Sequence, residues 1–448
     1  MSASAKRLVI LGAGESGVGS AILGRKLGMD VFVSDAGVIP TRYKDELTAL
    51  GIPFEERGHA DALLLDADEV IKSPGIPDKA PVVKAIRAAN IPVISEIEFA
   101  GRHTGAVMVC ITGTNGKTTT TLLTHHLLSK AGLRVGLGGN VGRSFARQVA
   151  GEDHDYYVLE LSSFQLDGCY EFRADIAVLT NITPDHLDRY DYKLENYVQS
   201  KFRITQNQRQ QDAFIYCADD ELTMLQLDKL RPAMQCHPFS IRRKEGMSAW
   251  LDDDQLCIQT KNQPFTMSIH DLALQGKHNL YNSMAAGISG RILDIRKDIV
   301  RESFSDFENI EHRLEFVTTV HGIDFINDSK ATNVNSTWYA LESMKQPVIW
   351  IAGGVDKGND YGLLRELVQA NVKAIVCMGV DNSKIVQAFR DVVPEITETS
   401  SAIEAVQAAY RLGKKGDAVL LSPACASFDL FENYEDRGRQ FKAAVRNL

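Results

Sequence analysis

The stretch Gly113-Thr114-Asn115-Gly116-Lys117-Thr118 stands between the strand-like run Val107–Ile111 and a helix-like run that begins near Thr119. A strand, a glycine-rich turn and a helix in this order are typical of a phosphate-binding loop. The glycines let backbone N–H groups point inward, Lys117 supplies positive charge for the outer phosphates, and the Thr118 hydroxyl can ligate Mg2+. The stretch therefore predicts ATP binding, and a plain tight turn is the alternative.

The spacing of the glycines departs from the general pattern of such loops. In that pattern the first glycine lies farther ahead of the second, at the place where this chain has Ile111. Gly113 is only three residues before Gly116. The turn is therefore expected to be shorter than the general one.

Short β-branched runs alternate with longer helical patterns along the chain, which is typical of α/β layers around mostly parallel sheets. A chain of 448 residues is too long for one core and should form about three domains. We expect a Rossmann-like N-terminal domain at 1–96, a central P-loop-type ATP-binding α/β domain at 97–309, and a C-terminal Rossmann-like α/β domain at 310–448. Short strands and turns between about 205 and 275, beginning with Phe214–Cys217, predict a small antiparallel layer in the central domain.

The composition is that of a globular protein, and its net charge is negative. Hydrophobic residues make up 44%, charged residues 24%, and the net charge is -9, which argues against nucleic acid or an anionic membrane as a partner. No run approaches the roughly 18 apolar residues of a membrane span, and the start resembles no signal peptide. The seven cysteines are scattered without a C-x-x-C pair, so we expect a reducing cytoplasm and neither a disulfide scaffold nor a zinc site.

A second glycine loop, Gly12-Ala13-Gly14-Glu15-Ser16-Gly17, follows the strand-like run Leu8–Leu11. Asp35 stands 18 residues after it, at the end of the next strand-like run, which completes the fingerprint of a dinucleotide-binding domain. Alone, this region would predict an NAD-dependent oxidoreductase. The same geometry suits any nucleotide diphosphate, including the UDP of a sugar nucleotide. The later loop Ser73-Pro74-Gly75 also follows a strand and can offer N–H groups to a phosphate, or it is a structural turn.

Polar residues gather after the strands of the predicted central domain. Glu160 lies at the end of the strand-like run Tyr157–Leu161, where nucleotide-binding sheets often direct an acid toward magnesium. The segment Thr180–Asp188, which contains His186, follows another strand and should reach the same sheet edge. Asn140, in a Gly-Gly-Asn turn, is a candidate ligand for a substrate phosphate. A structural histidine and a simple turn are the alternatives for these last two.

In order and spacing, five features of the chain resemble the Mur ligases, which use ATP to add amino acids to the peptidoglycan precursor. They are Gly113–Thr118, Glu160, Thr183–Asp188, Lys201 and Gly276–Asn282. The resemblance spans essentially the whole chain. In the third unit, the segments Asn327–Asn333, Gly353–Gly358 and Leu421–Tyr434 are similar to the D-glutamate-adding member of the family. The Asp-Asn-Pro-Arg motif of the diaminopimelate-adding relative is missing.

The resemblance implies a monomeric cytoplasmic ligase whose substrates are ATP, UDP-N-acetylmuramoyl-L-alanine and D-glutamate, with an acyl phosphate as intermediate and two Mg2+ ions. The catalytic residues would be Lys117, Glu160, His186, Lys201 and Arg313. The metal ligands would be Thr118, Glu160, His186 and a carbamylated Lys201. ATP would contact Gly113, Thr114, Asn115, Gly116, Lys117, Thr118, Thr119, Asn279, Asn282, Arg313 and Asp328.

The two other substrates have their own expected residues. The UDP-substrate would bind Gly14, Glu15, Ser16, Asp35, Ser73, Gly75 and Asn140. D-Glutamate would bind Lys330, Thr332, Lys357 and Ser427, because two cations and two hydroxyls suit a substrate with two carboxylates, and the ring of Tyr434 would pack beside it.

Three other functions stay open at this point. A ligase of the same superfamily that extends folate with glutamate would share the ATP site without needing a UDP-sugar. An NAD oxidoreductase would use the glycine loop at 12–17 but leaves Lys117, Glu160 and His186 without a role. The third alternative is a non-catalytic nucleotide-binding protein.

Overall fold

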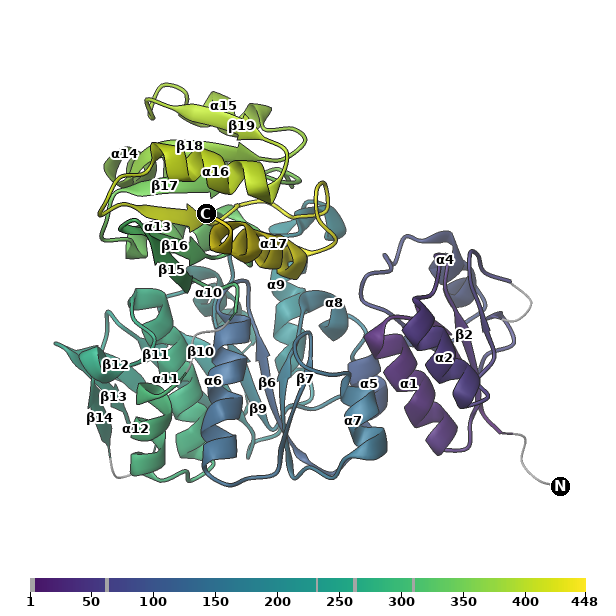
Figure 1. The fold of residues 1–448 in the computed structure, drawn as a ribbon. Helices are drawn as coiled ribbons and strands as arrows, with labels where there is room; N and C mark the ends of the chain where they lie inside the picture. The colour runs from purple at the N-terminus through teal and green to yellow at the C-terminus, as the bar shows by residue number, and fades with distance from the viewer. Residues whose placement is uncertain (1–4, 61–63, 231–232, 261–263, 308–310) are drawn as a thin grey trace. The chain divides into compact units, whose positions relative to one another are not determined.

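The computed structural model describes residues 5–60, 64–230, 233–260, 264–307 and 311–448. The chain forms two compact units, Met1–Phe307 and Glu308–Leu448 (Figure 1). The first unit contains two sheets and the second contains one, and all three have helices around mostly parallel strands. The α/β fold class is confirmed, while the boundaries near 96 and 309 stay predictions. In the described part of the chain, no helix is long and apolar enough to cross a membrane.

The N-terminal sheet has five parallel strands in the order β3-β2-β1-β4-β5. The strands are β1 Arg7–Leu11, β2 Asp30–Ser34, β3 Phe54–Glu55, β4 Glu69–Lys72 and β5 Val93–Ile94. The helices are α1 Glu15–Lys26, α2 Thr41–Ala49, α4 Pro81–Ala88 and α5 Glu96–Gly101. The chain runs outward from β1 on one side and resumes with β4 on the other. The crevice between the loops after β1 and β4 is therefore the topological switch point, where open α/β sheets bind ligands.

The central sheet has nine strands in the order β14-β13-β12-β11-β10-β9-β6-β8-β7. The strands are β6 Val107–Thr112, β7 Val135–Gly139, β8 Tyr156–Glu160, β9 Ile176–Leu179, β10 Ala213–Cys217, β11 Gln235–Ser240, β12 Ala249–Asp252, β13 Gln255–Ile258 and β14 Phe265–Ser268. The helices are α6 Lys117–Lys130, α7 Phe145–Gly151, α8 Ser163–Leu166, α9 Leu194–Phe202, α10 Glu221–Leu230, α11 Lys277–Ile292 and α12 Lys297–Ser305. Short 3-10 turns lie at Leu187–Arg189, Arg203–Thr205 and Ile269–Asp271.

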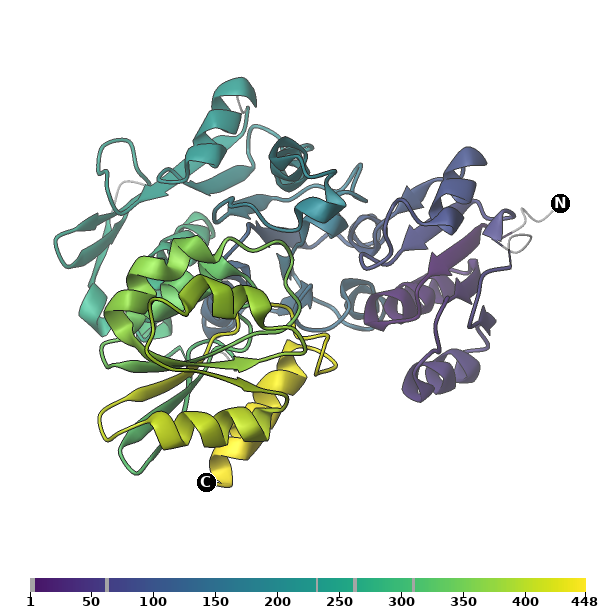
Figure 2. The ribbon, with the colours of Figure 1, turned by 90° about the horizontal axis from the view of Figure 1, so that it is seen from above.

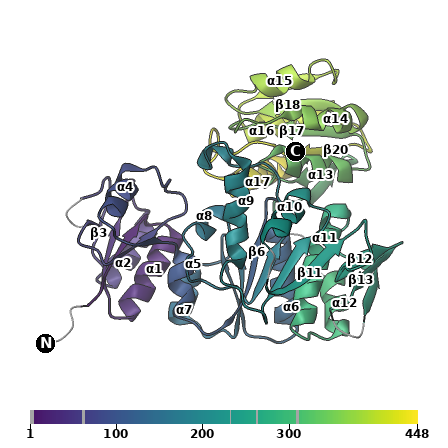
Figure 3. The same ribbon diagram turned by 180° about the vertical axis from the view of Figure 1, so that it is seen from behind.

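The predicted antiparallel layer is smaller than expected and continues the main sheet. Only β12, β13 and β14 are joined by antiparallel pairing, and Figures 1 and 3 show them at the outer edge. The run Phe214–Cys217 was expected to belong to this layer, but it lies in β10, which pairs in parallel with β9 and β11. Every residue of β10 is buried, as a strand covered on both faces requires.

The C-terminal sheet has six strands in the order β15-β16-β20-β17-β18-β19, and only β15 is antiparallel to its neighbour. The strands are β15 Glu315–Val320, β16 Ile323–Asn327, β17 Val348–Ala352, β18 Val372–Met378, β19 Ile396–Thr399 and β20 Ala418–Leu421. The helices are α13 Val334–Ser343, α14 Arg365–Asn371, α15 Ser383–Phe389, α16 Ala402–Leu412 and α17 Tyr434–Arg446, with a 3-10 turn at Tyr361–Leu364. Two apolar clusters cover its faces: α16 and α17 pack in one, and α13 to α15 in the other (Figure 2).

Within the first unit, two buried carboxylates, Glu69 and Glu98, help to join the N-terminal and central sheets. Arg102 donates to Glu69 at the start of β4 and to Glu98 in α5, with N···O distances of 2.8 and 2.9 Å. Glu98 is fully buried and also accepts N–H groups of Tyr170 and Phe172, at 2.9 and 2.8 Å. These contacts fix α5 between the two sheets.

Replacing Glu98 with alanine should lower the free energy of unfolding by about 3 kcal/mol, because the N–H groups of Tyr170 and Phe172 lose their acceptor and Arg102 loses one of its carboxylates. Urea denaturation followed by circular dichroism measures the change. Glu171→Ala is the matched control, because Glu171 pairs with the same Arg102 at 3.9 Å but its side chain is 79% exposed. Equal losses in the two variants would contradict the role given to Glu98.

Candidate active site

The phosphate loop is a tight turn that only glycine can make at two positions. Gly113 has a φ of 148°, and a Cβ there would lie 1.9 Å from Thr180 Oγ1. Gly116 has a φ of 79°, and its Cβ would lie 2.4 Å from Asn282 Oδ1. Ile111 is a buried residue of β6, which continues to Thr112. The strand therefore fills the place of the missing first glycine, and the turn is short as expected.

Thr118 and Glu160 are brought together behind this loop. The Thr118 hydroxyl donates to Glu160 Oε2 at 2.6 Å, because β8 lies beside β6 and both end at the same sheet edge. Asn140 donates its side-chain N–H to Glu160 Oε1 and its backbone N–H to the Glu160 carbonyl, both at 2.8 Å. A hydroxyl, a carboxylate and an amide oxygen are the hard oxygen donors that Mg2+ prefers. The residues present therefore fit a magnesium ion.

Two lysine amines converge on one carbonyl oxygen. Lys117 Nζ donates to the carbonyl of Gly113 at 2.9 Å and to that of Thr114 at 2.8 Å. Lys201 Nζ, from α9, donates to the same Gly113 oxygen at 2.6 Å and lies 4.5 Å from the Tyr197 ring centroid. Lys201 is 1% exposed, and burial together with the Lys117 charge holds its pKa well below the usual value. A neutral amine at this position fits the chemistry that carbamylation needs.

The segment that follows β9 lies directly against the phosphate loop. Thr114 Oγ1 donates to the Thr183 carbonyl and accepts from the Thr183 N–H, both at 3.0 Å. Asn115 accepts at its carbonyl from Thr180 Oγ1 at 2.6 Å. His186 follows in a left-handed conformation with a φ of 53°, and its Nε2 is 3.7 Å from Asp185. The segment that carries His186 therefore begins against the phosphate loop, and the imidazole itself contacts the Phe164 ring, with a centroid distance of 5.3 Å.

Candidate adenine-binding residues lie on the first turns of α11, which packs on α6. Asn282 Oδ1 accepts from Thr120 Oγ1 at 3.2 Å, and its Nδ2 donates to Asn279 Oδ1 at 3.2 Å. Asn279 in turn donates to the Gln275 carbonyl at 2.9 Å. Thr119, also expected at the nucleotide, is buried in the first turn of α6. Asn282 thus lies directly beside Gly116, the residue that precedes α6.

In the N-terminal sheet, two expected substrate acids already have protein partners. Asp35 accepts the N–H groups of Ala13 and Gly37, both at 2.7 Å, so it shapes the glycine loop. Glu15 begins α1 and accepts from Arg147 Nε at 3.0 Å and from the Ser144 N–H at 3.2 Å. Burial alone would raise the pKa of Glu15, but these partners lower it on balance.

The other expected residues of that site lie in two places. Gly14 precedes α1, and Ser16 stands in the first turn of that helix. Ser73 lies so near the glycine loop at 12–17 that a Cβ on Gly12 would be 2.5 Å from the Ser73 hydroxyl. Gly75 follows in the same turn, with open space where its Cβ would be. Asn140 comes from the central sheet, where it follows β7 and donates to Glu160.

In the C-terminal unit, Asp328 is buried directly after β16. It accepts from Ser422 Oγ at 2.8 Å and from the Leu314 N–H at 3.3 Å. Burial raises the pKa of its carboxyl to about 7, although Ser422 and the positive charge of Arg313 act to lower it. The positive charge of Arg313 therefore favours the ionised form of the Asp328 carboxyl.

The candidate D-glutamate residues lie in three loops at one edge of this sheet and at the start of α17. Lys330 and Thr332 follow β16, Lys357 follows β17, and Ser427 and Tyr434 follow β20. Lys330 Nζ lies 5.1 Å from the centre of the Tyr434 ring. Ser427 is buried and Lys357 is exposed.

Sequence reasoning missed Arg437, which ties these three loops together. Its side chain is 1% exposed, and its guanidinium donates to the carbonyls of Ser329, Cys425 and Gly353 at 2.8, 3.2 and 3.5 Å. These carbonyls belong to the loops after β16, β20 and β17. An arginine on a helix gives no sequence signal that separates it from a surface residue, so only the fold identifies it.

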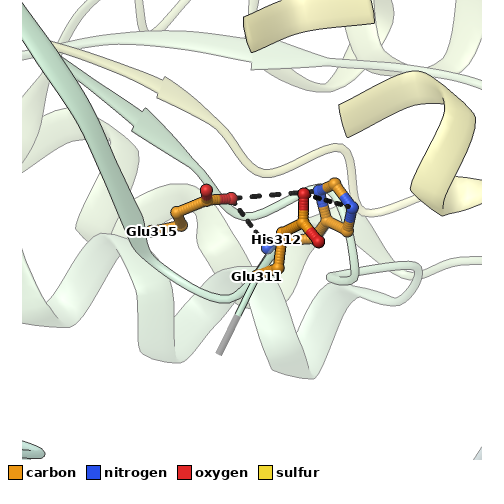
Figure 4. Close-up of side chains that lie close together, drawn as sticks. All are labelled: Glu311, His312 and Glu315. Atoms are coloured by element: carbon orange, nitrogen blue, oxygen red, sulfur yellow. Dashed lines mark hydrogen bonds and ion pairs between the residues drawn. The ribbon is translucent and has the colours of Figure 1, made fainter. Parts of the chain in front are cut away.

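Glu311, His312 and Glu315 also lie close together, with donor atoms within 4.8 Å of one another (Figure 4). Lys442 Nζ is 2.5 Å from Glu311 and 2.8 Å from Glu315, so a protein cation already balances the two carboxylates. Asn327 donates to His312 Nδ1 at 2.9 Å. We therefore assign this cluster a structural role at the start of β15.

Three family models match the chain in sequence order. They are the N-terminal domain of MurD-like Mur ligases over residues 6–95, the Mur ligase middle domain over 111–290, and the glutamate ligase domain of Mur ligases over 312–425. The chain is 56% identical to the UDP-N-acetylmuramoylalanine–D-glutamate ligase of Christiangramia forsetii, over 99% of this chain and 100% of the relative. It is 43% identical to the protein of that name from Chlorobaculum parvum, over 98% and 97% of the two chains.

Solved structures share the fold at low identity. A UDP-N-acetylmuramate-alanine ligase, MurC, from Thermotoga maritima matches with a TM-score of 0.63 and 20% identity over 99% of both chains. A MurF ligase from Thermotoga maritima in complex with ADP matches with a TM-score of 0.62 and 16% identity, over 93% of this chain and 95% of the other.

The tight turn can be tested without any ligand. Gly113→Ala should lower the free energy of unfolding by roughly 2 kcal/mol or more, because the new Cβ meets Thr180 Oγ1 in a backbone conformation that favours glycine. Gly132→Ala is the control, since Gly132 has a φ of 80° but open space around its Cβ. Urea denaturation should show the larger loss for Gly113→Ala, and the reverse order would contradict the packing described.

Proposed function

The chain belongs to the Mur ligase family, and from this premise we propose that it joins D-glutamate to UDP-N-acetylmuramoyl-L-alanine at the expense of ATP. Its full-length relatives with this name support the choice of substrates. The observation that carries the chemistry is that Lys117 and Lys201 converge on the Gly113 carbonyl, while Thr118 of the same loop contacts Glu160. We place the reaction in the cytoplasm, in peptidoglycan precursor synthesis, and expect a monomer.

The reaction must activate a carboxylate before an amide can form in water. The carboxylate oxygen of the L-alanyl group attacks the γ-phosphorus of ATP, the bond to the β-phosphate oxygen breaks, and an acyl phosphate and ADP result. The α-amine of D-glutamate then attacks the acyl carbon. The tetrahedral adduct loses inorganic phosphate and one proton, which leaves the amide.

Two anions must approach each other in the first step, so the site needs fixed positive charge where charge gathers in the transition state. Lys117 and the N–H groups of the phosphate loop supply it for ATP. Thr118 and Glu160 would hold one Mg2+, and His186 and a carbamylated Lys201 a second, and bound Mg2+ would add charge neutralisation at the phosphates. Arg313 and Asp328, in the other unit, stay predictions for the phosphates and the ribose.

Lys201 is suited to carbamylation by its environment. Its lowered pKa leaves the amine with a free electron pair that can form an N–C bond to CO2, with loss of one proton. The product is an anion, which would attract a metal that the ammonium form would repel. The resulting anion would also sit beside the positive charge of Lys117, whose amine contacts the same Gly113 carbonyl.

The decisive experiment measures phosphate release with Mg-ATP and UDP-N-acetylmuramoyl-L-alanine, adding D-glutamate, L-glutamate, L-lysine or diaminopimelate in separate reactions. Release that depends on D-glutamate alone, with the matching product mass, would establish the proposal. Release with another amino acid would overturn the choice of substrate, and a requirement for a folate in place of the UDP-sugar would favour the folate-extending alternative. Thermal protection by Mg-ATP and UDP but not NAD is the complementary test.

Lys201→Ala should reduce kcat by about 100-fold or more, since the variant can form no carbamate to hold charge beside the acceptor carboxylate. Added short carboxylates such as acetate should restore part of the activity. Lys193→Ala, at the exposed start of the same helix, should leave the rate within about twofold. Unchanged activity in Lys201→Ala would contradict the role of a carbamylated Lys201 in the reaction.

Arg437→Lys and Arg437→Met should raise the KM for D-glutamate about tenfold or more, because the loops that carry Lys330, Lys357 and Ser427 lose a common donor. The KM for ATP should change little. Arg439→Met, on the exposed side of the same helix, is the control. Thermal unfolding establishes that each variant is folded, and equal increases in the two KM values would contradict the positioning role.

A further inference from the structure

The switch point of the N-terminal sheet brings two phosphate-type loops together. Because β1 and β4 are adjacent, the loop at 12–14 lies against the loop at 73–76. The approach is so close that a Cβ on Gly12 would lie 2.5 Å from Ser73 Oγ. Any ligand of this sheet is expected at these two loops.

The start of α1 cannot supply the whole binding site for a diphosphate. In a dinucleotide-binding fold, the positive end of this helix faces the pyrophosphate. Here Glu15 is the first residue of α1, and its carboxylate pairs with Arg147 at 3.0 Å. A negative side chain at this end repels a second anion, so a diphosphate bound nearby needs positive charge from another segment.

Arg189 brings such a charge from the central sheet. It ends the 3-10 turn Leu187–Arg189, and its Nη2 donates to the Pro74 carbonyl at 3.3 Å. Its guanidinium carbon lies 4.4 Å from the centre of the Phe164 ring. Among the described residues, no carboxylate forms an ion pair with this guanidinium. A half-buried cation is thus held at the 73–76 loop with N–H donors left for an anion.

Lys72 adds a second positive charge at the same loop. Its side chain is only 11% exposed, and its Nζ donates to the Ile76 carbonyl at 2.8 Å. Burial lowers the pKa of Lys72, and the charge of Arg189 acts in the same direction. The acid that faces it is Asp78, at 3.4 Å with a half-exposed side chain. Two cations and one solvated carboxylate leave the loop with a net positive charge.

Resting on the proposed function, we propose that Arg189 binds the diphosphate of the UDP-sugar substrate at the 73–76 loop, with Lys72 supporting it from within the loop. Arg189 stands three residues after His186, and the Phe164 ring contacts both of them, with a centroid distance of 5.3 Å to the imidazole. Binding of the diphosphate therefore also orders the segment that carries His186. Arg189 links recognition of the nucleotide by the N-terminal sheet to the chemistry on the central sheet.

The test compares UDP with UMP, because only UDP carries the second phosphate. Isothermal titration calorimetry of the full chain should show that UDP binds more tightly than UMP. Arg189→Gln should weaken UDP by about tenfold or more while changing UMP much less, since a charge-assisted hydrogen bond is lost. Lys72→Met should have a smaller effect of the same kind. Lys84→Gln, an exposed cation on α4, is the matched control and should behave as the wild type.

Kinetics provide a readout that a purely structural defect would not give. Arg189→Gln should raise the KM for UDP-N-acetylmuramoyl-L-alanine and leave the KM for ATP within about twofold, and Arg189→Lys should recover part of the loss. An Arg189→Gln protein with wild-type affinity for UDP, or with equal losses for UDP and UMP, would overturn this inference and leave the proposed reaction intact. A wild-type protein that binds ATP but neither UDP nor the UDP-sugar would overturn both.

Discussion

The carbonyl oxygen of Gly113 accepts hydrogen bonds from two lysine amines, one from the start of α6 and one from α9, so it joins the phosphate loop to a distant helix. Two full positive charges so close together in a buried place would be costly. The cost is reduced because Lys201 is fully buried, which lowers its pKa, while Lys117 is only partly buried. Only a residue without a Cβ can place its carbonyl there, since Thr180 fills the space beside it.

Sheet topology explains why residues so distant in sequence meet at this point. Strands β8, β6 and β9 are neighbours and parallel, so Glu160, the phosphate loop and the segment with His186 all emerge at one edge. The C-terminal unit uses the same device with different chemistry. There the loops after β16, β20 and β17 carry lysines and hydroxyls, and the buried Arg437 joins their carbonyls. Each unit thus gathers its polar side chains through strand order, and a buried nitrogen donor, Lys201 or Arg437, then holds the loop carbonyls.

Motifs with a required backbone shape could be predicted from sequence, and residues that act through tertiary contacts could not. The strand-glycine-helix pattern located Gly113 and Thr118 because the turn itself dictates the residue types. Asp35 and Glu15 also matched a pattern, yet both are engaged with protein donors, since sequence does not show which partners the fold brings near. Arg437 and Arg189 have no local signature at all. The sequence of β10 is a short apolar run, and such a run can form a parallel or an antiparallel strand. Only the structure shows that β10 runs parallel to its neighbours.

Glu15 shows how one local motif can serve a different ligand. The glycine loop at 12–17 satisfies the dinucleotide fingerprint. A carboxylate at the start of α1, however, repels the negative charge of the pyrophosphate that this fingerprint usually binds. The fold uses that carboxylate to hold Arg147 on α7, which fastens the N-terminal sheet to the central one. Positive charge for a nucleotide then comes from the loop after β4 and from Arg189 of the central sheet. A shared backbone motif therefore identifies the fold, while the charges around it decide which nucleotide can bind.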